Sequence, residues 1–325
     1  MKIGNKELKH GLFLAPMAGY SDRAMRAVCK SFGAEYLTTE MVSAKAICYN
    51  DKKTPLLARI LKDETPCAIQ LFGSEPEFMA RAAEIAQEGM AGGEPPAAID
   101  INMGCPVPKV AGNGEGSALM KNPRLAERIV SAVKSAVKIP VTAKIRSGWD
   151  SESINAAEVA RALEAGGADA IFVHGRTREQ MYAGLADYSV IRDVKAAVSV
   201  PVIGNGDVVD GASARRLLDE SGCDGIMIGR GAVGRPFVFA EVAAMLDGVD
   251  YIPPSARERL EIALRQLTLA IEDKGERNAV AEARKQLAEY IKGISGAAQL
   301  RAEINAANTY AEVREVLIKA MEKAQ

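Results

Sequence analysis

The sequence has few of the residues that cross-link small extracellular domains or bind structural metals. It contains 5 cysteines and 2 histidines among 325 residues, and the cysteines are scattered with no Cys-x-x-Cys pair. An odd, dispersed set of cysteines argues against a disulfide framework, and so few histidines argue against a structural zinc site. We therefore expect free thiols and no bound metal.

Long apolar runs are also missing. No stretch approaches the ~20 consecutive apolar residues that a membrane-spanning helix needs. The first ten residues carry lysines, but neither the apolar run nor the small-residue cleavage site of a secretory signal follows them. We expect no membrane association and a cytoplasmic location.

Neither sign of charge is in excess, because 41 Lys+Arg stand against 42 Asp+Glu. This balance argues against a simple electrostatic nucleic-acid binder, although a local basic groove stays possible. A Gly-x-Gly-x-x-Gly fingerprint after a predicted strand is absent too, which disfavours a permanently bound NAD on a Rossmann unit. Any site for a polyanion must therefore be local.

From Gly11 to about Leu246 the sequence repeats one pattern, in which a short apolar run precedes a polar loop and an amphipathic stretch. The runs expected as strands are residues 12–15, 36–39, 67–71, 98–101, 141–145, 170–173, 202–204 and 225–228. This pattern predicts an α/β fold, a TIM (β/α)8 barrel over residues 1–250. A doubly wound open sheet is the competing architecture.

The pattern ends at Pro253-Pro254, and everything after this pair is helical in period without an apolar strand run. Leu260, Ala263 and Leu267 mark one apolar helix face. We therefore expect residues 251–325 to form a second domain, a C-terminal helical bundle.

One part of this predicted bundle is locally basic. Between Arg284 and Arg301, Glu289 is the sole acid against four basic residues, and Gly293 and Gly296 interrupt the helix. A solvated helix face explains such a run in the simplest way. A presented basic loop is the alternative.

The residues after each strand of a barrel face one mouth, so they can be considered together. Here they are unusually polar, and they comprise Gln70, Asn102, Cys105, Lys144, Arg146, His174, Arg176 and Arg178. A free cysteine usually packs as a small hydrophobe. Cys105 becomes a candidate reagent because of the residues expected around it.

Two glycine-containing loops follow the last two predicted strands, Gly204-Asn205-Gly206-Asp207 and Gly229-Arg230-Gly231. Backbone N–H groups can approach an anion there, and this is the usual phosphate site of the barrel. Pro16-Met17 offers an apolar platform, Gln70 suits the imide edge of a heterocycle, and Lys144 can stabilise negative charge on it. Flavin mononucleotide (FMN) meets all of these requirements.

Several motifs together resemble one family. They are Ala15-Pro16-Met17-Ala18-Gly19, Gln70-Leu71-Phe72-Gly73, Asn102-Met103-Gly104-Cys105-Pro106, Lys144-Ile145-Arg146, His174-Gly175-Arg176-Thr177, and Arg284-Lys285 with Lys292-Gly293. With these motifs the sequence resembles the tRNA-dihydrouridine synthases, most closely the bacterial DusB-type branch. The resemblance implies a barrel that binds FMN, NADPH as a transient reductant, and a helical domain that helps to hold tRNA. The implied reaction reduces the C5–C6 double bond of particular uridines to 5,6-dihydrouridine.

The resemblance also implies a role for individual residues, with Cys105 as the catalytic proton donor. The implied cofactor-binding residues are Pro16, Met17, Ala18, Gln70, Lys144, His174, Asn205, Gly206, Asp207, Gly229 and Arg230. Asn102 and Arg146 are implied at the uracil, and the implied contacts to tRNA phosphates are Lys109, Arg176, Arg284, Lys285 and Lys292. A thiol with an ordinary pKa of about 8.5 is mostly protonated near neutrality, so it can act as an acid without activation. We expect a monomer.

Two other functions stay open at this point. One is an FMN barrel that reduces a small molecule, such as a dihydroorotate- or enone-type oxidoreductase, for which the C-terminal bundle has no obvious use. The other is a tRNA-binding or chaperone-like protein whose flavin chemistry is incidental and whose function does not depend on Cys105. The sequence does not predict which uridine is reduced, nor NADPH over NADH.

Overall fold

The structure is a computed structural model, and it describes residues 1–323 of the chain. Within that range, eight parallel strands form the central sheet, at the positions that the apolar runs predict. They are β3 (Leu12–Leu14), β4 (Leu37–Thr38), β6 (Cys67–Phe72), β7 (Ala98–Met103), β8 (Val141–Arg146), β9 (Ala170–His174), β10 (Val202–Asn205) and β11 (Gly225–Ile228). A short additional strand, β5 (Val42–Ser43), pairs with β6 and was not predicted.

The sheet closes on itself. Neighbouring strands pair in chain order from β6 to β11, and β11 returns to pair with β3. Phe13 bridges to Tyr36, and the N–H of Leu14 donates to the Tyr36 carbonyl at 3.0 Å, which joins the first strand to the second. These pairings confirm the TIM-like barrel and exclude the open sheet.

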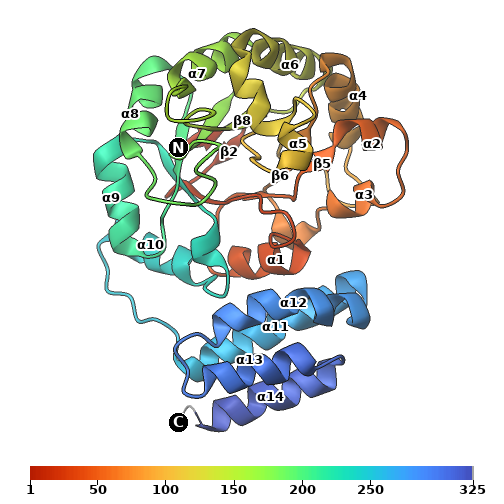
Figure 1. The fold of residues 1–325 in the computed structure, drawn as a ribbon, viewed down its shortest axis with the longest axis vertical. Helices are drawn as coiled ribbons and strands as arrows, with labels where there is room; N and C mark the ends of the chain where they lie inside the picture. The colour runs from red at the N-terminus through yellow and green to blue at the C-terminus, as the bar shows by residue number, and fades with distance from the viewer. Residues whose placement is uncertain (324–325) are drawn as a thin grey trace.

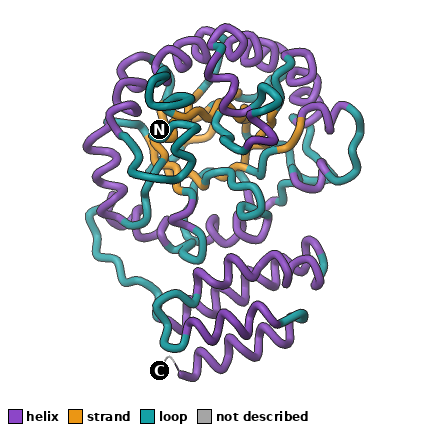
Figure 2. The backbone as a smooth tube through the Cα atoms, viewed as in Figure 1, coloured by secondary structure: helices purple, strands orange, loops and turns teal. Residues whose placement is uncertain are grey.

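Helices surround the strands, as the ring of purple around orange in Figure 2 shows. The main ones are α1 (Arg23–Ser31), α4 (Pro76–Ala86), α6 (Pro123–Ala136), α7 (Ala156–Ala165), α8 (Tyr188–Ala197), α9 (Gly211–Ser221) and α10 (Val238–Asp247). In α7 the predicted stripe of Val159, Ala160 and Leu163 is fully buried against the sheet. Shorter helices lie in the connections: α2 (Ala44–Cys48), α3 (Thr54–Leu57), α5 (Pro108–Ala111), η1 (Lys62–Glu64), η2 (Gly116–Lys121) and η3 (Arg230–Ala232).

A two-stranded hairpin, β1 (Lys2–Ile3) and β2 (Lys6–Glu7), covers one end of the barrel. Its buried Ile3 joins the side chains that fill the barrel, among them Phe13 and Phe172, whose rings meet edge to face at 5.2 Å. Gly4 lies against Pro140, the residue before β8, so the hairpin lies at the amino-terminal ends of the strands. The carboxyl-terminal ends are left for the site.

The chain continues from α10 through a connection into α11 (Ala256–Lys274), α12 (Glu276–Tyr290), α13 (Ala297–Ala306) and α14 (Tyr310–Lys323). These helices bury an apolar cluster of their own and lie beside α1, below the barrel in Figure 1. Lys274 Nζ reaches Asp22 at 2.6 Å, and Gln286 donates to the Tyr20 carbonyl at 3.2 Å. The C-terminal helices are thus attached next to the loop that follows β3. No helix that the structure describes is long and apolar enough to cross a bilayer.

A buried ion pair supports the loop after β3. Arg26 of α1 is 1% exposed, and its Nε donates to Glu64 at 2.8 Å. Its other nitrogens donate to the carbonyls of Ser21 at 2.9 Å and Arg59 at 3.0 Å. The guanidinium therefore joins α1, the loop after β3 and the segment that carries η1.

We predict that Arg26→Met lowers the free energy of unfolding by about 3–5 kcal/mol, because it leaves the Glu64 carboxylate buried without its partner. Urea denaturation followed by circular dichroism measures the change. The same substitution at Arg257, whose ion pair with Glu261 is exposed, is the control and should leave the urea midpoint nearly unchanged. Equal midpoints for the two variants would contradict the prediction.

Candidate active site

A cavity of about 780 Å³ opens at the carboxyl ends of the barrel strands. This volume is in the range of small-molecule and cofactor sites. The predicted residues that line it are Pro16, Met17, Ala18, Gln70, Asn102, Cys105, Lys144, Arg146, His174, Arg176, Asn205, Gly206, Asp207, Gly229, Arg230, Lys285 and Lys292. The structure therefore brings together residues from seven different strands or the loops after them, from α12, and from the segment just beyond α12.

Two predicted substrate-binding residues lie outside this cavity. Lys109 is exposed on α5. Arg284 lines a separate groove with Lys285 and Arg301, and its Nη2 donates to the Ala307 carbonyl at 2.8 Å. Both stay predictions as tRNA contacts.

Cys105 is half-buried in the loop after β7, two residues beyond the strand's end. Its N–H donates to Asn102 Oδ1 at 2.9 Å, which folds the loop back on the strand. Burial raises the pKa of the thiol, and this effect outweighs the opposite effects of a backbone hydrogen bond and of the charges on Arg146 and Lys144. The thiol is therefore protonated at neutral pH and is suited to act as an acid.

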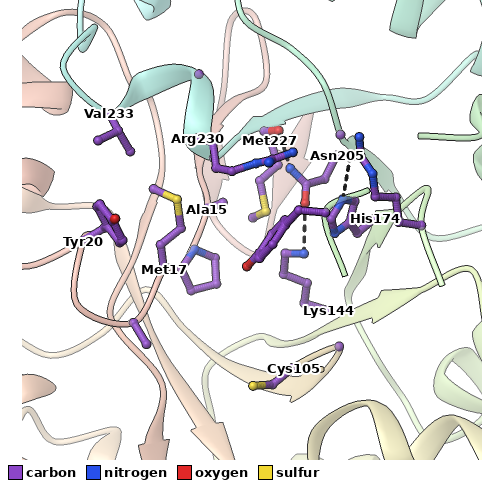
Figure 3. Close-up of a pocket in the computed structure, with 18 of the residues that line it drawn as sticks. Ala15, Met17, Tyr20, Cys105, Lys144, His174, Asn205, Met227, Arg230 and Val233 are labelled. Atoms are coloured by element: carbon purple, nitrogen blue, oxygen red, sulfur yellow. Dashed lines mark hydrogen bonds between the residues drawn. The ribbon is translucent and has the colours of Figure 1, made fainter. Parts of the chain in front are cut away.

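Lys144 points into the cavity from β8, as Figure 3 shows, and its Nζ donates to Asn205 Oδ1 at 3.0 Å. Within residues 1–323 no carboxylate forms an ion pair with it. Burial, and then the positive charge of Arg146, lower the pKa of Lys144 to about 7. A recessed cation whose hydrogen-bond partner is a neutral amide is suited to bind an anionic ligand.

Arg146 is 3% exposed and supports the loops at the mouth. Its Nε donates to the Gly104 carbonyl at 2.8 Å, and its Nη1 donates to the carbonyls of Thr177 at 2.8 Å and Met181 at 2.9 Å. Burial lowers its pKa to about 10, so it keeps its charge at neutral pH. Arg146 therefore fixes the loop of Cys105 while placing a positive charge near it.

Arg176, in the loop after β9, forms an ion pair with Asp207, in the loop after β10. Arg176 Nη2 lies 2.6 Å from one Asp207 oxygen and 2.8 Å from the other, and it also donates to the Gly184 carbonyl at 2.7 Å. Arg176 is 2% exposed. Its burial favours a structural role over the predicted contact with tRNA phosphates. Arg230, by contrast, is half-exposed and lies 3.7 Å from Asp207.

His174 is buried beside these cations. Burial, followed by the positive charges of Lys144 and Arg146, holds its pKa well below the usual range, so the imidazole is neutral at neutral pH. Tyr182, which the sequence analysis missed, covers this part of the cavity, with the Arg230 guanidinium 4.6 Å from its ring centroid. The sequence feature that could have predicted Tyr182 is its position after Arg176 and Arg178 in the loop that follows β9.

Within residues 1–323, no cluster of three or more His, Cys, Asp or Glu side chains is arranged to hold a metal ion. The site instead combines an apolar side at Met17 with a recessed cation and a protonated thiol. In Figure 3, Met17 and Cys105 lie on different sides of the cavity, and Lys144 lies next to Asn205. A cavity of this composition at the carboxyl mouth of a TIM barrel defines a barrel enzyme.

Comparison with known proteins identifies the family. A sequence model of the dihydrouridine synthase (Dus) family matches residues 13–325. The chain is 41% identical to a probable tRNA-dihydrouridine synthase of Rickettsia conorii over 97% of this chain and 94% of the relative. It is 40% identical to tRNA-dihydrouridine synthase B of Shewanella oneidensis over 96% of this chain and 95% of the relative.

The chain therefore belongs to the dihydrouridine synthase family, and its activity is that of a tRNA-dihydrouridine synthase, a flavin-dependent oxidoreductase. This confirms the family inferred from the motifs and decides against the two alternative functions. A solved structure of histamine dehydrogenase from Rhizobium sp. 4-9 is similar in fold, with a TM-score of 0.58 and 15% identity. That similarity covers 83% of this chain and 50% of the other, and it supports the fold alone.

The raised pKa of Cys105 leads to a prediction. We expect the rate of Cys105 alkylation by iodoacetamide to keep rising above about pH 8.5, where an unperturbed thiol begins to level off. Mass spectrometry of the peptide that contains Cys105 measures the rate. A synthetic peptide of residues 101–108 is the control, and a plateau at the same pH in protein and peptide would contradict the prediction.

Proposed function

We propose that the cavity binds FMN and that Cys105 is the proton donor in the reduction of a tRNA uridine by NADPH. The observation that carries this proposal is that one cavity holds both the protonated Cys105 thiol and the recessed Lys144 side chain, which forms no ion pair with a carboxylate of residues 1–323. Lys144 supplies the positive charge that a flavin ring requires at one edge, and Met17 supplies an apolar surface. Arg230, half-exposed beside the glycine loop, is available to an anionic phosphate.

The residues of the chain divide the chemistry between them. The flavin, when bound, supplies a hydride to C6 of the uracil. Cys105 keeps its proton available for C5, because burial holds the thiol in its acid form. Lys144 and Arg146 place positive charge where negative charge develops on the uracil carbonyl. His174 is neutral and can hydrogen-bond without adding charge.

The tRNA is proposed to approach over α12, with residues 1–250 as the FMN-binding catalytic domain and residues 251–325 as the tRNA-recognition domain. Lys285 lies 4.4 Å from the ring centroid of Tyr20 and, like Lys292, lines the cavity from the helical side. The two lysines therefore place positive charge between the C-terminal helices and the mouth of the barrel. The target base has to leave its stack to enter, which costs a few kcal/mol. We propose that the enzyme acts as a monomer in the cytoplasm.

We predict that Cys105→Ala keeps bound flavin and its reduction by NADPH but loses dihydrouridine formation by at least about 100-fold, because the substitution removes the proposed proton donor. Stopped-flow absorbance follows flavin reduction, and nucleoside mass spectrometry of tRNA follows the product. Cys48→Ala removes a different half-buried thiol and is the control, with wild-type rates expected. A colourless, folded wild-type protein would refute the flavin assignment, and an active Cys105→Ala protein would refute the role of the thiol.

The double substitution Lys285→Ala with Lys292→Ala should raise KM for tRNA about tenfold and reduce the dependence of binding on salt, because up to two phosphate contacts are lost. Flavin reduction by NADPH should change little. Lys319→Ala on α14, where the lysine pairs with Glu315, tests for a general charge effect. An unchanged KM in the double variant would place the tRNA elsewhere.

A further inference from the structure

Asp100 is a buried carboxylate in the middle of β7, and it does not line the cavity. It is 1% exposed, and its Cα register partners on the adjacent strands are Gln70 and Thr142. Oδ1 accepts a hydrogen bond from Thr142 Oγ1 at 2.6 Å, and Oδ2 accepts one from Gln70 Nε2 at 2.7 Å. Within residues 1–323 no lysine or arginine forms an ion pair with it. A carboxylate kept there without a cation is costly, so its position requires a reason.

The hydrogen bonds continue from Asp100 to the loop of Cys105. Gln70 Oε1 accepts from Asn102 Nδ2 at 2.8 Å. Asn102 Oδ1 in turn accepts the backbone N–H of Cys105 at 2.9 Å and that of Gly104 at 3.2 Å. A continuous chain of three side chains from two strands therefore connects a buried charge with the backbone of the candidate proton donor.

Burial raises the pKa of Asp100 to about 6, so the carboxylate is ionised in most molecules at neutral pH, and this charge fixes the direction of the chain of hydrogen bonds. An ionised carboxylate accepts hydrogen bonds and cannot donate them. Gln70 must therefore turn its NH2 group toward Asp100 and its oxygen toward Asn102, and Asn102 must turn its oxygen toward the loop. With both amides reversed, the NH2 group of Asn102 would face the N–H of Cys105, donor against donor.

We propose that Asp100 is a positioning residue for the reaction, which orients Gln70 and Asn102 and through them holds the loop of the proton donor. Asp100 touches neither the thiol nor the cavity surface, so it acts through the two amides. This inference rests on the proposed role of Cys105. Asn102, predicted from the sequence to face the uracil, then acts chiefly by holding the loop, because its oxygen accepts from the loop and its NH2 group donates to Gln70 Oε1 and to Met41 Sδ.

Asp100→Leu tests the proposal, because leucine is similar in size and accepts no hydrogen bond. We expect kcat for dihydrouridine formation to fall at least about tenfold, since a small displacement of the proton donor is costly. KM for tRNA should change by less than about twofold, because the proposed tRNA contacts of Lys285 and Lys292 lie in the C-terminal helical region. Alkylation of Cys105 in the enzyme as purified, without tRNA, should become faster as the loop loses its anchor.

Two matched variants separate positioning from packing. Thr142→Val removes the other hydrogen bond of the same carboxylate and leaves the chain to Cys105 intact, so it should keep at least about half of the wild-type kcat. Asp100→Asn should restore most of the activity, because the amide oxygen can accept from Gln70 while its NH2 group donates to the Thr142 hydroxyl.

The outcomes are decisive in both directions. A wild-type kcat and alkylation rate in Asp100→Leu, or equal losses in Asp100→Leu and Thr142→Val, would overturn the proposal. If Asp100→Leu does not fold, Gln70→Leu interrupts the chain one step later. Because Gln70 is also proposed to bind FMN, alkylation of Cys105 is compared with that of the wild type with both proteins free of flavin; a faster rate supports the proposal, and an unchanged rate overturns it. Failure of the proposed function is distinguishable, because it shows as an active Cys105→Ala enzyme.

Discussion

The closure of β11 onto β3 is the constraint on which the rest of the site depends. Parallel strands that close into a barrel bring all their carboxyl ends to one mouth, whatever the distance between them in sequence. Met17, Cys105, Lys144 and Arg230 line one cavity for this reason. The hairpin that carries Ile3 covers the opposite end of the barrel, and the ion pair between Arg26 and Glu64 supports the loop after β3, whose Met17 lines the mouth.

Burial and the charge of Arg146 together set the pKa values of two groups in this mouth. Burial favours the neutral form of both the Cys105 thiol and the Lys144 amine, and the positive charge of Arg146 reinforces this effect at the amine but opposes it at the thiol. For the thiol, burial prevails. The cavity therefore holds an acid and a recessed amine side by side, an arrangement that suits a ligand bringing its own negative charge.

Much of this could be predicted from the sequence, because the strands of a parallel barrel are continuous apolar runs whose polar successors share one mouth. The strand positions and most of the cavity lining, including Lys144 and Asn205, follow from that rule. The hairpin at Ile3 and the strand β5 do not, because Lys2–Ile3, Lys6–Glu7 and Val42–Ser43 each contain polar residues and form no apolar run. The burial of Arg176 depends on how the loop after β9 folds over it, and the role of Asp100 depends on partners from two other strands. Neither is visible in a local pattern.

Lys285 and Glu289 of α12 and Lys292 just beyond it close one side of the cavity. The contact of Gln286 with Tyr20 and that of Lys274, at the end of α11, with Asp22 hold the helices there. The order of synthesis gives this arrangement a consequence. A ribosome completes all eight barrel strands about 60 residues before it adds the last of these wall residues, so a nascent barrel has its thiol and its cations but an incomplete enclosure. The active-site cavity is therefore complete only after nearly the whole chain has been synthesised.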